Sequence, residues 1–400
     1  MTTYDDLGVQ PVVNAAGYLT RLGGSLMSED VLAAMREAAQ NYVPMDTLQA
    51  AASRAIAEAT GAEAGIVTCG AAAGLLLGTA ACMTGLDPHK MNQLPDTSGM
   101  RSEVVIQKAQ RDGYDHAVRA TGARLVEIGM PYGTRRYELR SALTDRTAAV
   151  LFIVARSKGI PLSLDETIEV AHEKGIPVLV DAAAELPPAE NLRNFIAAGA
   201  DLVTFSGGKA IRGPQAAGIL CGRRDLIAAA ALQMLDMDVD AETWTPPVGL
   251  GADLLVAGPP EQGIGRALKV GKEEIVGLIV ALQAYTRRDH AGDLAAWEEA
   301  GRRVEATLAD SGLAAKYVSP GESDIGVPMV RLRCPGGAAQ ARELVRRLRG
   351  VERPIYLGEA QIDRGVLTVN PVTLKPGEEI FLADAVARVW RHMGAPVRDR

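Results

Sequence analysis

The chain alternates short runs of apolar, often β-branched residues with longer segments in which apolar residues recur every three or four positions. The short runs are typical of buried strands, and the longer segments are typical of helices that pack one face on a sheet. Seven runs are predicted to be strands: 65–68, 103–107, 124–127, 148–154, 177–181, 202–205 and 217–221. Four segments among them are predicted to be helices: 71–83, 116–121, 164–174 and 192–198.

The order of these elements predicts an α/β fold. Strands that alternate with helices form a mostly parallel sheet, and the helices cover both of its faces. In such sheets a ligand binds at the carboxyl ends of the strands. Side chains that follow the ends of the predicted strands are therefore the first candidates for a functional site.

The C-terminal third has a different pattern. A long helical region is predicted from 270 to 308, with an interruption near 290–292. After it, the predicted strands 329–332 and 366–370 mix with the predicted helices 338–348 and 380–392, which indicates a small α+β domain.

We expect three parts in a chain of 400 residues, which is long enough for about two domains. Residues 1–45 are predicted to be an N-terminal segment that packs with the small domain. Residues 46–265 are predicted to form the large, cofactor-binding domain. Residues 266–400 are predicted to form the linking helix and the small C-terminal domain.

The composition narrows the class of protein. The net charge is −7 with both signs interspersed, and no basic run follows the pattern of a nucleic-acid-binding segment, so we expect no nucleic-acid partner. The four cysteines form no C-x-x-C pair, which favours reduced thiols over a zinc site, and we predict no metal. The N-terminus lacks the basic and apolar regions of a signal peptide, and no apolar stretch is long enough to span a bilayer. A cytoplasmic protein without a membrane partner is expected.

One lysine and one aspartate carry the main chemical prediction. Lys209 follows the strand 202–205 in a glycine-rich segment, and Asp181 ends the strand 177–181. Pyridoxal phosphate needs a lysine that forms a Schiff base and an acid that keeps the pyridine nitrogen protonated. Alone, Lys209 is better explained as a surface lysine in a glycine-rich turn, and Asp181 is explained equally well as a helix N-cap. Together they predict a pyridoxal phosphate site.

The segment after the first strand is a candidate phosphate cradle, formed by Gly70, Ala71 and Ala72. Small residues at a helix N-terminus expose backbone N–H groups, and the helix dipole favours an anion there. Ser206 is predicted to add a hydroxyl to the same phosphate. Close packing of the helix on the sheet is the alternative explanation for these small residues.

A ring that stacks on the pyridine is predicted after the strand 103–107. His116 is the first candidate and Tyr114 the second, and Gln110 is a further residue that is expected to point into the site. A histidine that caps or packs at a helix start is the alternative for His116.

Arginines are the candidates for the remaining anionic groups. The glycine-rich segment 263–272 is predicted to deliver Arg266 or Lys269 to a phosphate, in this subunit or a neighbouring one. A planar guanidinium binds a carboxylate through two hydrogen bonds. The candidates for the substrate carboxylate are Arg21, Arg212, Arg353 and Arg364.

The chain resembles the fold-type I pyridoxal phosphate enzymes, in particular the selenocysteine synthase-like branch and its D-glucosaminate-6-phosphate ammonia-lyase-like proteins. The resemblance covers nearly the whole chain and is carried by the stretches 13–20, 68–73, 180–188, 205–209, 211–215, 263–266 and 269–274. It implies that Lys209 is the Schiff-base lysine and that Asp181 is the partner of the pyridinium. It also implies a three-layer α/β/α large domain, a small C-terminal domain, and an active site at the interface of a homodimer or higher homo-oligomer.

The resemblance implies a lyase that acts at Cα and Cβ of an amino acid or amino-sugar acid and releases ammonia and a 2-keto acid. A racemase or epimerase that uses the same carbanion is the alternative. A selenocysteine synthase-like transferase would need tRNA, which the net charge of −7 disfavours. The alternative that is not an enzyme is a protein that binds the cofactor but has no turnover.

Overall fold

The computed structural model describes residues 3–154, 160–240, 242–245, 250, 260–323 and 325–394. The chain divides into two compact units. The large unit is Ser25–Arg288, and the small unit combines Met1–Gly24 with Asp289–Arg400. Residues 25–45 and 266–288, which the sequence analysis assigned outside the large domain, thus lie in the large unit. The reason is that α2 (Glu29–Ala39) packs against α11 (Lys272–Arg287).

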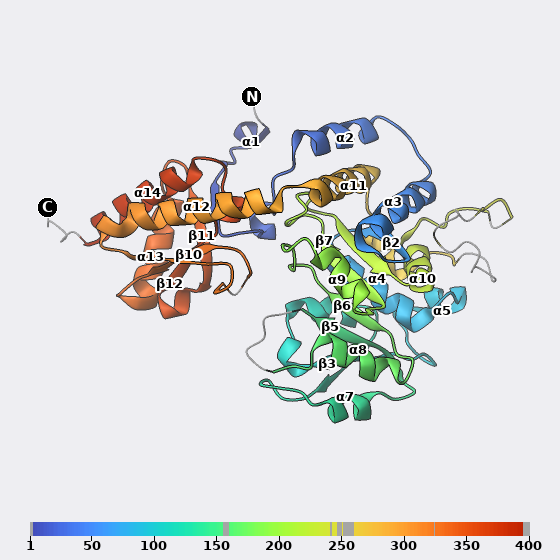
Figure 1. Cartoon of the computed structure of the whole chain (residues 1–400). Coiled ribbons are helices and arrows are strands. Elements are labelled where there is room, and N and C mark those ends of the chain that lie inside the picture. Colours follow the sequence, from blue (N-terminus) through green and yellow to red (C-terminus); the bar gives the residue numbers. More distant parts are fainter. Residues whose placement is uncertain are drawn as a thin grey trace. The chain divides into compact units, whose positions relative to one another are not determined.

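The large unit is built on a seven-stranded sheet with the order β2-β8-β7-β6-β5-β3-β4 (Figure 1). Its strands are β2 (Ala64–Thr68), β3 (Glu103–Gln107), β4 (Arg124–Ile128), β5 (Thr147–Ile153), β6 (Val178–Asp181), β7 (Leu202–Ser206) and β8 (Gly218–Gly222). Each lies within a residue or two of a strand predicted from the sequence.

Strand direction determines which ends of the strands meet. Strands β3 to β7 pair in parallel, and β8 runs antiparallel to both β7 and β2. Strand β2 therefore points the same way as β7. The carboxyl ends of β2, β7, β6, β5 and β3 consequently share one edge of the sheet, which is called the carboxyl edge below.

Ten α-helices of the large unit lie among the described residues. They are α2, α3 (Met45–Thr60), α4 (Ala71–Thr84), α5 (Pro88–Gln93), α6 (His116–Arg119), α7 (Arg136–Ala142), α8 (Leu164–His172), α9 (Asn191–Ala197), α10 (Arg224–Met234) and α11. Short 3-10 turns include η2 (Lys108–Gln110), η3 (Gly113–Asp115) and η5 (Ile264–Leu268).

Helices cover both faces of this sheet. On one face, Gly74 of α4 lies directly against Thr204 of β7. A Cβ at Gly74 would lie only 2.3 Å from Thr204 Oγ1. On the other face, the ring of Phe205, the next residue of β7, lies 6.2 Å from the ring of Phe195 in α9. Successive side chains of a strand point to opposite faces. The expected α/β class with a mostly parallel sheet is confirmed.

Buried glutamines complete the hydrogen bonding at two places along the sheet. Gln49 of α3 is fully buried, and its amide both donates to Val67 O (2.9 Å) and accepts from Val67 N–H (3.0 Å). Gln107 makes the same pair of bonds with Leu162 (3.3 and 2.7 Å). Because β2 is an edge strand, the Gln49 amide satisfies backbone groups that would otherwise be buried without partners.

The small unit has a five-stranded sheet with the order β1-β11-β12-β10-β9. Its strands are β1 (Val13–Ala15), β9 (Ala314–Val318), β10 (Met329–Arg333), β11 (Ile355–Gln361) and β12 (Val366–Val369). Its α-helices are α1 (Thr3–Asp6), α12 (His290–Leu308), α13 (Gly337–Arg349) and α14 (Glu378–Gly394), and η1 (Thr20–Leu22) and η7 (Ile362–Arg364) are 3-10 turns. Apolar side chains of this sheet and of α12, α13 and α14 form a buried core.

The long helical region predicted from 270 to 308 is two helices. The chain leaves the helical conformation at Arg288, and Asp289 caps α12 by accepting the Gly292 N–H at 2.9 Å. A capping aspartate satisfies N–H groups at a helix start, so the break lies just before the predicted position.

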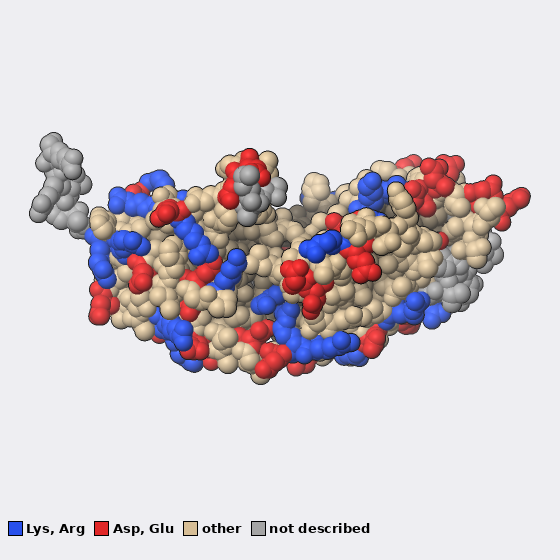
Figure 2. Space-filling view, turned by 90° about the horizontal axis from the view of Figure 1, so that it is seen from above, with Lys and Arg blue, Asp and Glu red and all other residues tan. Residues whose placement is uncertain are grey.

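Charges of both signs intermingle on the face that Figure 2 shows. No helix of the described residues is long and apolar enough to cross a membrane. Among the described residues, no group of three or more histidine, cysteine, aspartate or glutamate side chains could hold a metal ion.

We expect Gln49→Met to lower the free energy of unfolding by about 2–4 kcal/mol, because both backbone groups of Val67 would be buried without partners. Gln283→Met, at an exposed position of α11, is the matched control and should change stability by less than about 0.5 kcal/mol. Denaturant unfolding measures both. Equal stability of the two variants would contradict this role of Gln49.

Candidate active site

Lys209 lies in a loop that backbone hydrogen bonds close tightly. The Gly207 N–H donates to Ala217 O at 2.8 Å, and the Gly213 N–H donates back to Gly207 O at 2.9 Å. A Cβ at Gly208 would lie only 2.7 Å from Gln215 Cα. Glycine is required where two backbone segments approach this closely. The loop therefore fixes Lys209 three residues beyond the end of β7.

The side chain of Lys209 is half-buried, and burial lowers the pKa of its amine. The charges of Asp181 and Glu185 act in the opposite direction and raise this pKa. A lysine whose neutral form is favoured by burial is suited to act as a nucleophile and as a base.

Asp181 ends β6 and pairs in register with Thr204 of the adjacent parallel strand β7. The residue is 8 % exposed, and its carboxylate accepts the Ala183 N–H at 3.0 Å. Burial raises the pKa of Asp181, and the nearby charge of Asp112 adds to this rise. The Ala183 hydrogen bond and the charge of Lys209 lower the pKa. A buried carboxylate of this kind is stabilised when it meets a cation.

The cradle lies at the same edge of the sheet. Strand pairing aligns Thr68 of β2, Gly218 of β8 and Ser206 of β7 in one row. Gly70 follows Thr68 with φ of +82°, a conformation that strains other residues, and α4 begins at Ala71. The backbone turn thus directs the first amides of a 14-residue helix toward the carboxyl edge.

One threonine links the cradle to the lysine strand. Thr204 Oγ1 lies 3.3 Å from Ala71 O and donates to Ile219 O at 3.0 Å. A Cβ at Gly218 would lie 2.5 Å from the carbonyl carbon of Gly70, so β8 passes directly against the cradle backbone. These contacts fix the first turn of α4 relative to the strands that carry Asp181 and Lys209.

These residues fit pyridoxal phosphate. The cradle and Ser206 supply hydrogen-bond donors. Ala71 is half-buried and Ala72 is exposed, so a ligand can reach the start of α4. The Asp181 carboxylate, buried and aligned with β7, suits a protonated ring nitrogen. Lys209 supplies the amine. The assigned roles of Lys209, Asp181, Ala71, Ala72 and Ser206 remain predictions that this geometry supports. The predicted role of Gly70 as a donor is not supported, because its N–H donates to Thr68 O at 2.9 Å.

The loop after β3 carries the predicted stacking residues. His116 and Tyr114 are both exposed, and His116 Nδ1 lies 3.4 Å from Arg119 Nη2. The loop is fixed by Asp115, which is 1 % exposed and pairs with Arg111 and with Arg119 (3.2 Å). Stacking by His116 remains a prediction.

Gln110 is the residue of this loop that is most in need of a partner. It is 2 % exposed, and its Oε1 has no hydrogen bond within the described part of the chain. A buried acceptor without a donor costs free energy, which a ligand that donates a hydrogen bond would recover.

Among the candidate arginines, Arg212 lies nearest to Lys209 along the chain. It is half-buried, lies three residues after Lys209, and has φ of +61°, which is rare for a residue other than glycine. Its N–H donates to Lys209 O at 2.9 Å. Strained residues concentrate at functional sites because the surrounding fold enforces them. The predicted contact of Arg212 with the substrate carboxylate remains a prediction.

Of the other candidate cations, Lys269 is exposed in the large unit, and the rest are paired with carboxylates or lie in the small unit. Arg266 of η5 pairs with Asp236 at 3.3 Å. Arg21 pairs with Glu359 at 3.2 Å, and Arg353 pairs with Glu378. Arg364, in η7, is exposed. The proposed contacts of Arg266 with a phosphate, and of Arg21 and Arg364 with a substrate, remain predictions.

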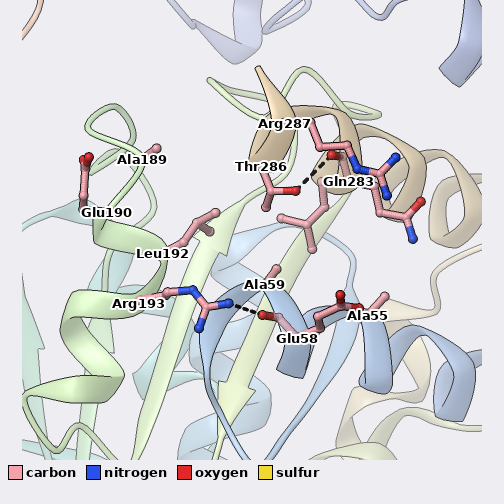
Figure 3. Close-up of a pocket in the computed structure, with 11 residues that line it drawn as sticks. Ala55, Glu58, Ala59, Ala189, Glu190, Leu192, Arg193, Gln283, Thr286 and Arg287 are labelled. Carbon is pink, nitrogen blue, oxygen red and sulfur yellow. Dashed lines mark hydrogen bonds between the residues drawn. The ribbon is translucent and has the colours of Figure 1, made fainter. Parts of the chain in front are cut away.

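A separate hollow of about 450 Å³ lies among α3, α9 and α11 (Figure 3). Arg193 reaches across from α9, and its Nη2 donates to Glu58 O. The lining residues are Ala55, Glu58, Ala59, Ala189, Glu190, Leu192, Arg193, Leu282, Gln283, Thr286 and Arg287. None of the residues predicted to bind the cofactor belongs to this lining, so the hollow is distinct from the candidate active site.

Two charged neighbours of the site were missed in the sequence analysis. The charge of Asp112 raises the pKa of Asp181, and the charge of Glu185 raises the pKa of Lys209. Each follows the carboxyl end of a strand by four or five residues. That spacing was the available signal, but it does not show which of several loop carboxylates affects the pKa of Asp181 or of Lys209.

Comparison with known proteins gives two relatives that match nearly the whole chain. D-glucosaminate-6-phosphate ammonia lyase of Salmonella typhimurium is 32 % identical, and the match covers 97 % of this chain and 98 % of that protein. The 5'-C-glycyluridine monooxygenase-decarboxylase of a Streptomyces species is 35 % identical, with coverage of 98 % and 93 %. The two relatives differ in the reaction for which they are named.

The solved structure of D-glucosaminate-6-phosphate ammonia-lyase superposes with a TM-score of 0.79 at 30 % identity, and the match covers 99 % of this chain and 100 % of that chain. The family model described as SelA, L-seryl-tRNA selenium transferase, matches residues 12–238. The resemblance identified from the sequence is thereby confirmed, and the chain belongs to the SelA family.

Proposed function

We propose that this protein is a pyridoxal phosphate-dependent lyase that releases ammonia and a 2-keto acid from an amino acid or amino-sugar acid. The observation that carries the proposal is that Asp181 ends β6 and Lys209 follows the end of β7, the adjacent parallel strand. The full-length similarity to an ammonia lyase supports both the cofactor and this type of reaction.

Each residue of the site has a physical role in this proposal. The N–H groups of Ala71 and Ala72, with the Ser206 hydroxyl, bind the cofactor phosphate, and Gly70, whose own N–H donates to Thr68 O at 2.9 Å, shapes the turn that presents them. Asp181 holds the proton on the ring nitrogen. When bound, the cofactor withdraws electrons from the carbon that carries the substrate amine. Arg212 binds the substrate carboxylate and so orients that carbon relative to Lys209.

Lys209 Nζ is the base in this proposal. Burial favours its neutral form, so Nζ has a lone pair with which to take the proton from the substrate Cα. The leaving hydroxyl on Cβ departs as water after it gains a proton. For the rest, we propose a cytoplasmic homodimer or higher homo-oligomer without nucleic-acid or membrane partners.

The products test this function. We expect the loaded enzyme to release ammonia and 2-keto acid in equal amounts from a 3-hydroxy-2-amino acid or an amino-sugar acid. The enzymatic assay of both products should show none with Lys209→Ala, whereas Lys90→Ala, at a surface position of α5, should retain the activity. Formation of the opposite enantiomer alone would identify a racemase. Release of CO₂ with consumption of O₂ would match the second relative instead.

Asp181→Asn should separate stability from function. Because the folded pKa of Asp181 is raised, its stabilising contribution is complete below the unfolded pKa and is lost as the pH rises through the folded value. At pH 7 the cofactor-free variant should therefore be at least as stable as the parent, with the difference shrinking toward pH 4. The variant should nevertheless lose activity at least about a hundredfold. Thermal unfolding between pH 4 and 8 and the keto-acid assay measure the two effects.

A loss of stability in cofactor-free Asp181→Asn at pH 7 would contradict the inference that the buried, charged carboxylate of Asp181 destabilises the folded protein. Asp225→Asn is the control, because Asp225 is exposed to solvent in its pair with Arg223. It should keep its activity.

A further inference from the structure

Helix α11 packs directly on residues 207–213, which are called the lysine loop below because they contain Lys209. A Cβ at Gly207 would lie 2.6 Å from Leu278 Cδ1, and a Cβ at Gly213 would lie 3.0 Å from the same atom. Leu278, in the middle of α11, is fully buried. The two ends of the lysine loop thus lie against one leucine, and the position of the loop depends on α11.

Arg288 follows the last residue of α11 and reaches back to the lysine loop. Its Nη1 donates to Ala210 O at 3.1 Å, although 78 residues separate the two in the chain. Ala210 is 3 % exposed, and a buried carbonyl needs a donor within the protein. Because Ala210 directly follows Lys209, this hydrogen bond holds the backbone next to the lysine.

The Arg288 guanidinium is itself held in place. The side chain is half-buried, and its Cζ lies 5.3 Å from the centre of the Tyr285 ring, one turn earlier in α11. Tyr285 is 1 % exposed, so the ring is a fixed surface. A planar guanidinium can place its face on an aromatic ring and still donate hydrogen bonds from its edge. Arg288 therefore joins the end of α11 to the lysine loop through two contacts.

We propose that Arg288 is a positioning residue, which holds the lysine loop through Ala210 O where Lys209 Nζ can reach the substrate Cα. This inference rests on the function proposed above. Backbone bonds of Gly207 and Gly213 give the loop its shape, whereas Arg288 fixes the loop relative to α11. Proton transfer needs the two reacting groups within hydrogen-bond reach, and a displacement of about 1 Å can slow a reaction about a hundredfold.

Hydrogen exchange of the full-length, cofactor-free protein, followed by mass spectrometry, tests this link without catalysis. Arg288→Met keeps an apolar stem beside Tyr285 but removes the donors. We expect the amides of the peptide 206–217 to exchange about three- to tenfold faster, because local opening of the loop no longer breaks this hydrogen bond. Peptides from β3 and β4, on the far side of the sheet, should exchange as in the parent protein.

Two variants control for charge and for the donor. Arg287 is an exposed cation at the same helix end, where a positive charge is favoured. Arg287→Met should therefore leave the exchange of the lysine loop unchanged. Arg288→Lys retains a charged donor and should restore part of the slow exchange.

In the loaded enzyme, Arg288→Met should lower kcat about tenfold or more with KM within about threefold, and Arg288→Lys should recover part of kcat. Parent-like exchange of the lysine loop in Arg288→Met, or equally fast exchange in Arg287→Met, would overturn the inference. Faster exchange along the whole chain, or failure of Arg288→Met to fold, would overturn it too, since either would show a role in the whole fold. Failure of the parent protein to load cofactor on Lys209 would instead defeat the proposed function, and the exchange profiles would distinguish the two failures.

Discussion

The candidate site depends on the backbone pairing of β2, β8, β7 and β6. This pairing aligns Thr68, Gly218 and Ser206 in one row and joins Asp181 to Thr204. A helix N-terminus, a lysine and an acid that are far apart in sequence therefore meet at one edge of the sheet. A shift of one strand by a single residue would turn its side chains to the opposite face and separate these groups.

The same pairing places charged groups where burial disfavours their charged forms. Burial raises the pKa of Asp181 and lowers the pKa of Lys209. In both residues this shift opposes the charge that the residue carries in water. Closely packed glycines and the strained backbone of Arg212 hold the same loop. Such costs are typical of functional sites, since the surrounding fold must maintain an arrangement that a ligand later stabilises.

Much of this arrangement could be predicted from the sequence, because it follows from strand ends. The apolar runs before Asp181 and Lys209 predicted the strands β6 and β7 within a residue or two of their observed bounds. Strand β11 was missed because Gly358, Glu359 and Gln361 interrupt its apolar pattern. The buried amide of Gln49 and the positive φ of Arg212 were missed as well, because they arise from tertiary contacts that periodicity does not record.

The most direct test of the account is the position of the covalent link to the cofactor. The purified protein, loaded with pyridoxal phosphate and reduced with borohydride, can be digested and its peptides mapped by mass spectrometry. The account predicts a single pyridoxyl adduct on Lys209 and a visible absorption band that reduction removes. An adduct on another lysine, or a protein that binds no pyridoxal phosphate, would contradict it.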